Sequence, residues 1–113
     1  MIPTEKCGLP QITQARIISV LTQEIGIEKA ILYGSRAKST YSDGSDIDLT
    51  LIAPTFSLSE LSRLEIAIDD LLLPYKIDLS LFHQIDNQKL IDHILRVGIF
   101  FTCALKLNGN WPK

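Results

Sequence analysis

The sequence predicts a small α/β (α+β) domain in which helices pack on one face of a mixed β-sheet. Apolar runs of strand length alternate along the chain with stretches whose apolar residues recur at helical spacing. Two of the expected strands alternate apolar and polar residues, so each offers one side to the helices and leaves the other open. A chain of 113 residues has room for one compact domain, which we expect to span residues 1–113.

Two helical segments are expected before the middle of the chain. The first runs from Gln11 to Ile25 and ends at Gly26, a typical C-cap residue. Its expected buried face consists of Ile12, Ala15, Ile18, Leu21 and Ile25. A second, brief helical turn is expected to start at Ser35 as N-cap and to continue through Ser39.

Two longer helices follow. Ser57 and Glu60 have the spacing of a capping box, and Pro74 stops the helix that they begin. The apolar residues of that helix are Leu61, Leu64, Ile68, Leu71 and Leu72. Asp86 is expected to cap a last helix that ends at Gly98. That helix carries Leu90, Ile91, Ile94 and Leu95.

Three strands are expected, at Ala30 to Tyr33, Asp46 to Ala53 and Lys76 to Phe82. The apolar segment from Ile99 to Leu105 fits either a final strand or a continued helix. Alternation in the second and third strands places their carboxylates on the face opposite the apolar residues. These carboxylates meet on that open face if the two strands are neighbours in a suitable register.

Asp46 and Asp48 are separated by one residue, which predicts a metal site. Side chains at positions i and i+2 of a strand leave the same face about 6.5 to 7 Å apart at their Cα atoms, so their oxygens can bracket a divalent ion. Phosphoryl and nucleotidyl transfer both need positive charge on the attacking and the leaving oxygen, which two metal ions about 3.5 to 4 Å apart can supply. Mg²⁺ suits such a site because it accepts carboxylate and phosphate oxygens.

A small-residue turn precedes the carboxylates. Gly34 lets the backbone approach a ligand closely, and Ser35 offers a hydroxyl and an N–H group at a helix start, where anions bind. The expected ligand is a phosphate group. Arg36 could add positive charge there, whereas Lys38 is expected to lie in solvent.

Taken together, Gly34, Ser35, the run Ser45-Asp46-Ile47-Asp48-Leu49 and Asp78 resemble the signature of the DNA polymerase beta-like nucleotidyltransferase superfamily. The resemblance is greatest to minimal nucleotidyltransferases of the MntA-like antitoxin type, and it covers roughly residues 28–82. One position departs from the pattern, because Ser39 stands where the family commonly has Gly. A positive φ at that position would cost serine roughly 1 kcal/mol or more and would change the shape of the spacer.

The resemblance implies roles for seven residues. Asp46, Asp48 and Asp78 would be catalytic and would hold two divalent ions, normally Mg²⁺. The nucleotide would be bound by Gly34, Ser35, Arg36 and Ser45. The implied reaction moves AMP from ATP to a hydroxyl group and releases pyrophosphate.

The resemblance also implies a protein partner. Minimal nucleotidyltransferases of this kind form one half of two-protein modules whose other half is an all-helical HEPN-type protein. In some modules the helical protein is a ribonuclease toxin, which the nucleotidyltransferase adenylylates. A chain this short has no room for a second domain that binds an acceptor, so we expect the acceptor on such a partner.

Three other functions fit part of this motif. The run Asp46 to Thr50 also matches the Asp-x-Asp-x-Thr motif of haloacid dehalogenase-like phosphatases. In those enzymes, however, the apolar strand runs into the motif, whereas here it follows. Those phosphatases, and glycosyltransferases with a metal-binding Asp-x-Asp, also have larger cores. A non-catalytic module that keeps the motif and masks a partner remains an alternative.

Composition limits the other functions. The formal net charge is −2, from 11 basic and 13 acidic residues without a block of one sign, so an extended nucleic-acid groove is not expected. Cys7 and Cys103 lack metal-ligand spacing and fit free thiols in a reducing compartment. The sequence shows neither a signal peptide nor an apolar run of about 18 residues, so we expect a cytoplasmic protein.

Overall fold

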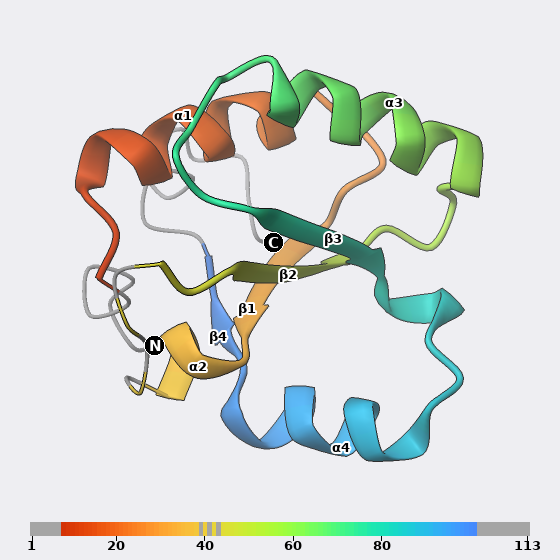
Figure 1. Cartoon of the computed structure of the whole chain (residues 1–113). Helices are drawn as coiled ribbons and strands as arrows, with labels where there is room; N and C mark the ends of the chain where they lie inside the picture. Colours follow the sequence, from red (N-terminus) through yellow and green to blue (C-terminus); the bar gives the residue numbers. More distant parts are fainter. Residues whose placement is uncertain (1–7, 39, 41, 43, 102–113) are drawn as a thin grey trace.

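A computed structural model describes residues 8–38, 40, 42 and 44–101 of the chain. Its helices and strands alternate as the sequence predicts (Figure 1). In chain order they are α1 (Gln11–Thr22), β1 (Lys29–Tyr33), α2 (Ser35–Lys38), β2 (Ile47–Ile52), α3 (Leu58–Asp69), β3 (Ile77–Leu81), the 3₁₀ turn η2 (Phe82–Gln84), α4 (Gln88–Val97) and β4 (Ile99–Phe100).

The strands form one mixed sheet in the order β3-β2-β1-β4. Strand β1 is antiparallel to β2 and to β4, while β2 and β3 run parallel. The final apolar segment therefore begins as a strand, which decides between the two options for Ile99 and Phe100. Residues 102–105 of that segment lie outside the described part of the chain.

Helices α1 and α3 cover one face of the sheet (Figure 1). The main hydrophobic core lies beneath them and joins both helices to the inward-facing residues of the strands. Among its most enclosed members are Ile17, Leu21, Leu32, Leu49 and Leu64. Burial of each such side chain contributes about 1.5 to 3 kcal/mol, so this layer holds the sheet in place.

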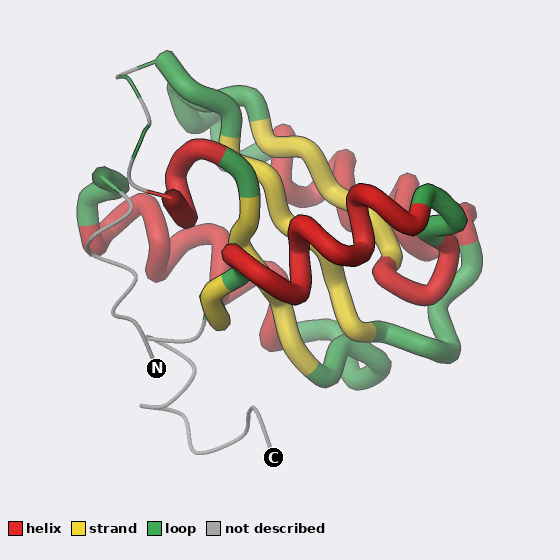
Figure 2. Tube along the Cα trace, turned by 90° about the horizontal axis from the view of Figure 1, so that it is seen from below, coloured by secondary structure: helices red, strands yellow, loops and turns green. Residues whose placement is uncertain are grey.

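Helix α4 lies on the opposite side of the sheet, where Figure 2 shows it in front of the strands. Its Ile94 is only 1% exposed, and the helix packs against β1. Gly98 permits this approach, since a Cβ there would meet the carbonyl oxygen of Ile94 and Cγ2 of Ile31. Helix α4 thus partly covers the second face of the sheet, in addition to the predicted helices on the first face.

The predicted buried face of α1 was wrong in part. Ile12 is 69% exposed, Ala15 is exposed, and Ile25 lies beyond the end of the helix and is fully exposed. A spacing of three residues falls short of the 3.6-residue turn, so a stripe of that spacing winds around the helix instead of following one side. The residues that α1 buries are Thr13, Gln14, Ile17, Ile18 and Leu21.

The helix starts show which caps form. Ser57 and Glu60 form the predicted capping box at the start of α3. For α4, the cap is Asn87 and not the predicted Asp86, because the Asn87 side chain accepts hydrogen bonds from the N–H groups of Lys89 and Leu90. The position of the cap depends on where the chain turns after η2, which sequence pattern alone does not specify.

Two helix ends also differ from expectation. Ser35 is the first residue of α2 and not its cap, because the carbonyl of Gly34 already accepts the N–H of Lys38 at 3.2 Å. Helix α3 ends before Leu72, which is 87% exposed and has a φ of 55°. Within the described residues, no helix combines the length and the apolar character that crossing a lipid bilayer requires.

Candidate active site

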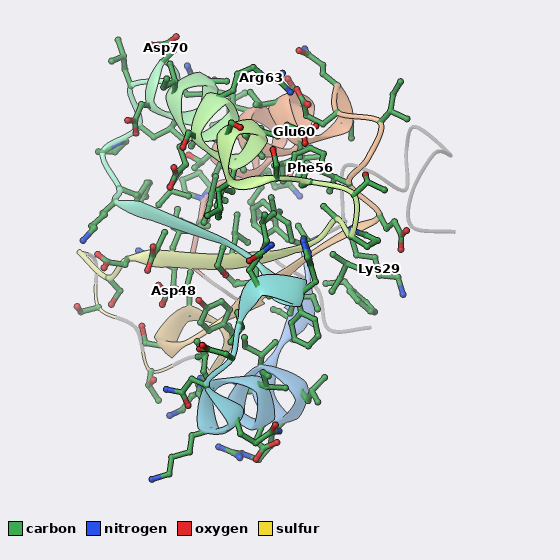
Figure 3. All side chains as sticks on the ribbon, turned by 90° about the vertical axis from the view of Figure 1, so that its right-hand side faces the viewer. Lys29, Asp48, Phe56, Glu60, Arg63 and Asp70 are labelled. Atoms are coloured by element: carbon green, nitrogen blue, oxygen red, sulfur yellow. The ribbon has the colours of Figure 1, made fainter. Side chains whose placement is uncertain are left out.

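The carboxylates of Asp48 and Asp78 stand side by side on two neighbouring strands. The two residues are Cα partners in the parallel pair β2 and β3, so they project from the same face of the sheet. This is the face opposite α1 and α3, and in Figure 3 the labelled Asp48 lies on the side of β2 that faces α2 and α4. The neighbouring strands and the suitable register that the sequence left open are therefore both present.

Asp46 lies immediately before β2, and Asp48 is the second residue of that strand. The aspartates therefore stand at the start of the strand, as the sequence predicted. Asp46 and Asp78 are exposed, while Asp48 is half-buried. Together they present three oxygen-bearing groups to a surface that solvent and ligands can reach.

The carboxylates of this cluster repel one another. Burial raises the pKa of Asp48, and the neighbouring charges of Asp78 and then Asp46 raise it further, against smaller opposite effects of His93 and Lys76. Among the described residues, none of the three carboxylates forms an ion pair. A bound cation would relieve their mutual repulsion.

The donor chemistry fits a divalent ion, because carboxylate oxygens on one face are the ligands that Mg²⁺ accepts. As the side chains stand, the described residues hold no group of three Asp, Glu, His or Cys side chains arranged to grip a metal. Rotation of the exposed Asp46 and Asp78 side chains would be needed to close around an ion. Metal binding by these residues therefore stays a prediction.

A polar line extends from the carboxylates across the same face. Ser80 donates a hydrogen bond to Oγ1 of the fully buried Thr50 at 2.9 Å, and its side chain lies near that of Tyr33. Burial is the main cause that raises the pKa of Tyr33. Tyr33 is in turn the cross-strand partner of Asp48, so these polar side chains lie beside the carboxylate on the same face of the sheet.

Helix α4 contributes His93 to the site. The rings of Tyr33 and His93 meet edge to face, with centroids 6.3 Å apart and planes at 81°. No ligand spacing marks His93 in the sequence, so the sequence alone does not place it at the site. Thr50 and Ser80 did carry a signal, since each follows a predicted catalytic aspartate by two residues and so shares its face.

The backbone of Gly34 approaches Asp48 more closely than a residue with a Cβ could. Its φ is +78°, and a Cβ at this position would collide with Oδ2 of Asp48. Glycine is therefore required here by backbone conformation and by the neighbouring carboxylate. Ser35 follows at the start of α2 and is half-buried.

Ser45 and Arg36 are held by the protein itself. Oγ of Ser45 accepts the Ser42 N–H at 2.8 Å, and the Ser45 N–H donates to the Ser42 carbonyl at 3.0 Å. Arg36 is 2% exposed and donates from Nε and Nη2 to the Ser45 carbonyl. Protein encloses the guanidinium in this arrangement, and the contact of Arg36 with a nucleotide stays a prediction. Lys38 is exposed, as expected.

A separate groove of about 540 Å³ lies between α3 and β3. Ile66, Leu73, Tyr75 and Ile77 line it together with polar residues of α3. None of the predicted site residues lines this groove, so it is distinct from the carboxylate face.

Comparison with known proteins identifies the fold. The sequence profile described as Polymerase beta, Nucleotidyltransferase matches residues 15–105, which include every predicted site residue. The chain belongs to this nucleotidyltransferase family. Membership confirms the resemblance read from the motif.

Solved structures agree with this nucleotidyltransferase fold. One toxin–antitoxin crystal structure with AMP-PNP superposes with a TM-score of 0.65 at 22% identity, covering 78% of this chain and 71% of that one. The toxin–antitoxin pair MntA–HepT gives a TM-score of 0.60 at 20% identity, covering 81% of this chain and 71% of that one. A comparison with curated proteins finds no match.

Proposed function

We propose that this nucleotidyltransferase domain transfers AMP from ATP to a hydroxyl group on an all-helical HEPN-type partner protein. In this proposal the two chains form a toxin–antitoxin-like pair. The observation that carries the proposal is the register of Asp48 and Asp78 beside the turn at Gly34, in a chain of the nucleotidyltransferase family. Support for the context comes from the similar toxin–antitoxin structures, one of which contains AMP-PNP.

The proposed roles follow from the geometry. Asp46, Asp48 and Asp78 would hold divalent ions, which when bound supply positive charge to the attacking and leaving oxygens. The N–H group of Ser35, at the start of α2, would face the triphosphate. The hydroxyl oxygen of the acceptor bonds to the α-phosphorus as the bond from that phosphorus to the β-phosphate oxygen breaks, and pyrophosphate leaves. The hydroxyl proton passes to Asp78 or to solvent.

The position of Asp78 suits an acceptor carried by another protein. Strand β3 is an edge strand of the sheet, and Asp78 is exposed. A hydroxyl on a partner can thus approach Asp78 from outside without displacing another strand. The half-buried Asp48 lies on the inner side, next to Gly34, where the nucleotide would sit.

The test is to co-express the chain with a HEPN-type protein, purify both, add ATP and Mg²⁺, and weigh each chain by mass spectrometry. We expect the partner to gain one or more AMP units. Asp46→Asn and Asp48→Asn should abolish the gain, while Glu65→Gln on the exposed side of α3 should not.

Other outcomes would contradict the proposal. Neutralisation of the partner without a mass change, retained in both aspartate variants, would show a masking module without catalysis. Release of phosphate from simple phosphomonoesters would indicate a phosphatase.

A further inference from the structure

We propose that Arg36 is a positioning residue that ties together three segments of the site, and not a ligand of the nucleotide. The three segments are α2 with the Gly34 turn, the peptide that enters Asp46, and the segment that leads to Asp78. This inference rests on the proposed function for its catalytic consequence. Its structural part can be tested independently.

The first tie joins α2 to the start of β2. Nε and Nη2 of Arg36 both donate to the carbonyl oxygen of Ser45, at 3.2 and 3.1 Å. That carbonyl belongs to the peptide unit whose nitrogen is the amide of Asp46. Two donors on one rigid guanidinium therefore fix the plane of the peptide from which Asp46 projects.

The other side of Asp46 is also held. The N–H of Ile47 donates to the carbonyl of Lys76 at 2.9 Å, which begins the pairing of β2 with β3. Asp46 therefore lies between two anchored peptide units, although its side chain is exposed. The backbone direction of this carboxylate is thus set by protein contacts, while the carboxylate stays free to meet a ligand.

The last tie reaches the strand that carries Asp78. Cζ of Arg36 stands 5.1 Å from the centroid of the Tyr75 ring, within the range of a cation–π contact. Tyr75 lies three residues before Asp78 and packs against the main core. One guanidinium thus contacts both segments that bring carboxylates to the site, from a helix that starts next to Gly34.

A role in positioning accounts for the burial of Arg36. A buried charge is costly unless it is paired or hydrogen-bonded, so a side chain meant to meet phosphates in solvent gains nothing from being 2% exposed. A planar fork can bond one carbonyl twice and stack on a ring at the same time, which a lysine ammonium cannot do. The geometry therefore requires arginine at this position.

The experiment compares Arg36→Met, which keeps the length of the side chain, with Lys38→Met on the exposed side of the same short helix. Arg36→Met should lower kcat of AMP transfer by about 10- to 100-fold, the range typical of residues that orient metal ligands, with KM for ATP changed less than about threefold. Lys38→Met should change neither. A rise in KM for ATP with kcat retained would overturn the inference and would show a phosphate ligand.

A second readout does not need catalysis. Amide hydrogen exchange should accelerate about tenfold or more at Ile47 in Arg36→Met, because the peptides around Asp46 lose one anchor. The amides of α1 should keep their exchange rates. Unchanged exchange at Ile47 would overturn the inference, whether or not the wild-type protein transfers AMP.

Direct metal binding separates the two proposals. If the wild-type protein binds Mn²⁺ but transfers no AMP, the proposed function fails, and weaker Mn²⁺ binding in Arg36→Met would still support the tie. If Arg36→Met does not fold, the pair Tyr75→Leu and Tyr75→Phe replaces it. The leucine variant should reproduce the faster exchange at Ile47, whereas the phenylalanine variant keeps the ring face and should not. Equal behaviour of the two Tyr75 variants would contradict the tie.

Discussion

Gly34 and Asp48 lie so close together that a single methyl group on Gly34 would collide with the Asp48 carboxylate. The turn and the second aspartate are fourteen residues apart in sequence, yet antiparallel pairing of β1 with β2 brings them together. The Asp48 carboxylate itself thus requires glycine at position 34, in addition to any contact with a triphosphate.

Gly34→Ala should therefore damage both stability and activity. The φ of +78° alone costs alanine about 1 to 2 kcal/mol of folding free energy. The carboxylate must also move, and a shift of about 1 Å can lower a catalytic rate about 100-fold. Urea unfolding and AMP transfer measure the two effects.

The matched control for that substitution is Gly44→Ala. A Cβ at Gly44 meets no atom within 4 Å, so its stability should stay within about 0.5 kcal/mol of wild type. Retained activity in Gly34→Ala would show that the Asp48 carboxylate does not have to occupy its observed position.

Asp48→Asn should stabilise the metal-free protein at neutral pH. The pKa of Asp48 is raised in the folded protein above its usual value of 3.8, chiefly by burial and next by Asp78. The folded state therefore binds the proton more tightly than the unfolded state. Stability falls as pH rises from the unfolded pKa through the folded pKa, and the loss is complete above that window.

Thermal unfolding across pH, without divalent ions, tests this sign. The melting temperature of Asp48→Asn should exceed that of wild type near pH 7, and the difference should vanish below about pH 3.8, where both states are protonated. Added Mg²⁺ should raise the melting temperature of wild type only, since ligands stabilise the state that binds them. Glu65→Gln makes the same charge change on an exposed helix, and a similar gain there would attribute the effect to net charge.

Ile94 anchors α4 on the site face of the sheet. Its truncation in Ile94→Ala removes a side chain that is 1% exposed and should cost about 2 to 5 kcal/mol, as buried isoleucines do. The edge-to-face contact of Tyr33 with His93 should loosen with the helix, and this should appear as a change in the Tyr33 ring signals by NMR.

Leu95→Ala provides a neighbouring control in the same helix. Leu95 is 69% exposed, so its truncation should change stability by no more than about 0.5 kcal/mol. Equal losses in the two variants would show that α4 is not held through Ile94.

Ser57→Ala should lower stability without lowering activity. The substitution removes the capping box at the start of α3, where the Ser57 hydroxyl accepts the Glu60 N–H, and such caps contribute about 0.5 to 2 kcal/mol. Helix α3 covers the face opposite the carboxylates, so AMP transfer at a temperature well below unfolding should be unchanged. Ser62→Ala, exposed in the same helix, should change neither quantity, and lost transfer in Ser57→Ala alone would couple the two faces.

Some expectations from sequence were accurate for a local reason. Strand β2 was expected at Asp46 to Ala53 and spans Ile47–Ile52, because alternation and Pro54 mark its limits. The capping box of α3 depends only on residues three positions apart. By contrast, α1 buries Thr13 and Gln14, two polar residues that a pattern of apolar residues does not mark.

The features of the candidate site also fall into local ones, which the sequence determines, and long-range ones, which it does not. By itself, the sequence determined the family, the succession of helices and strands up to Gly98, and the side of each strand that carries its aspartates, since a strand's two-residue period and a motif's spacing are local properties. Only the tertiary structure decided that these two aspartates are register partners, that α4 brings His93 to Tyr33, and that Arg36 lies buried against Ser45. Those relationships arise from packing between segments far apart in the chain. Local sequence patterns do not specify such packing, so only the folded structure shows these contacts.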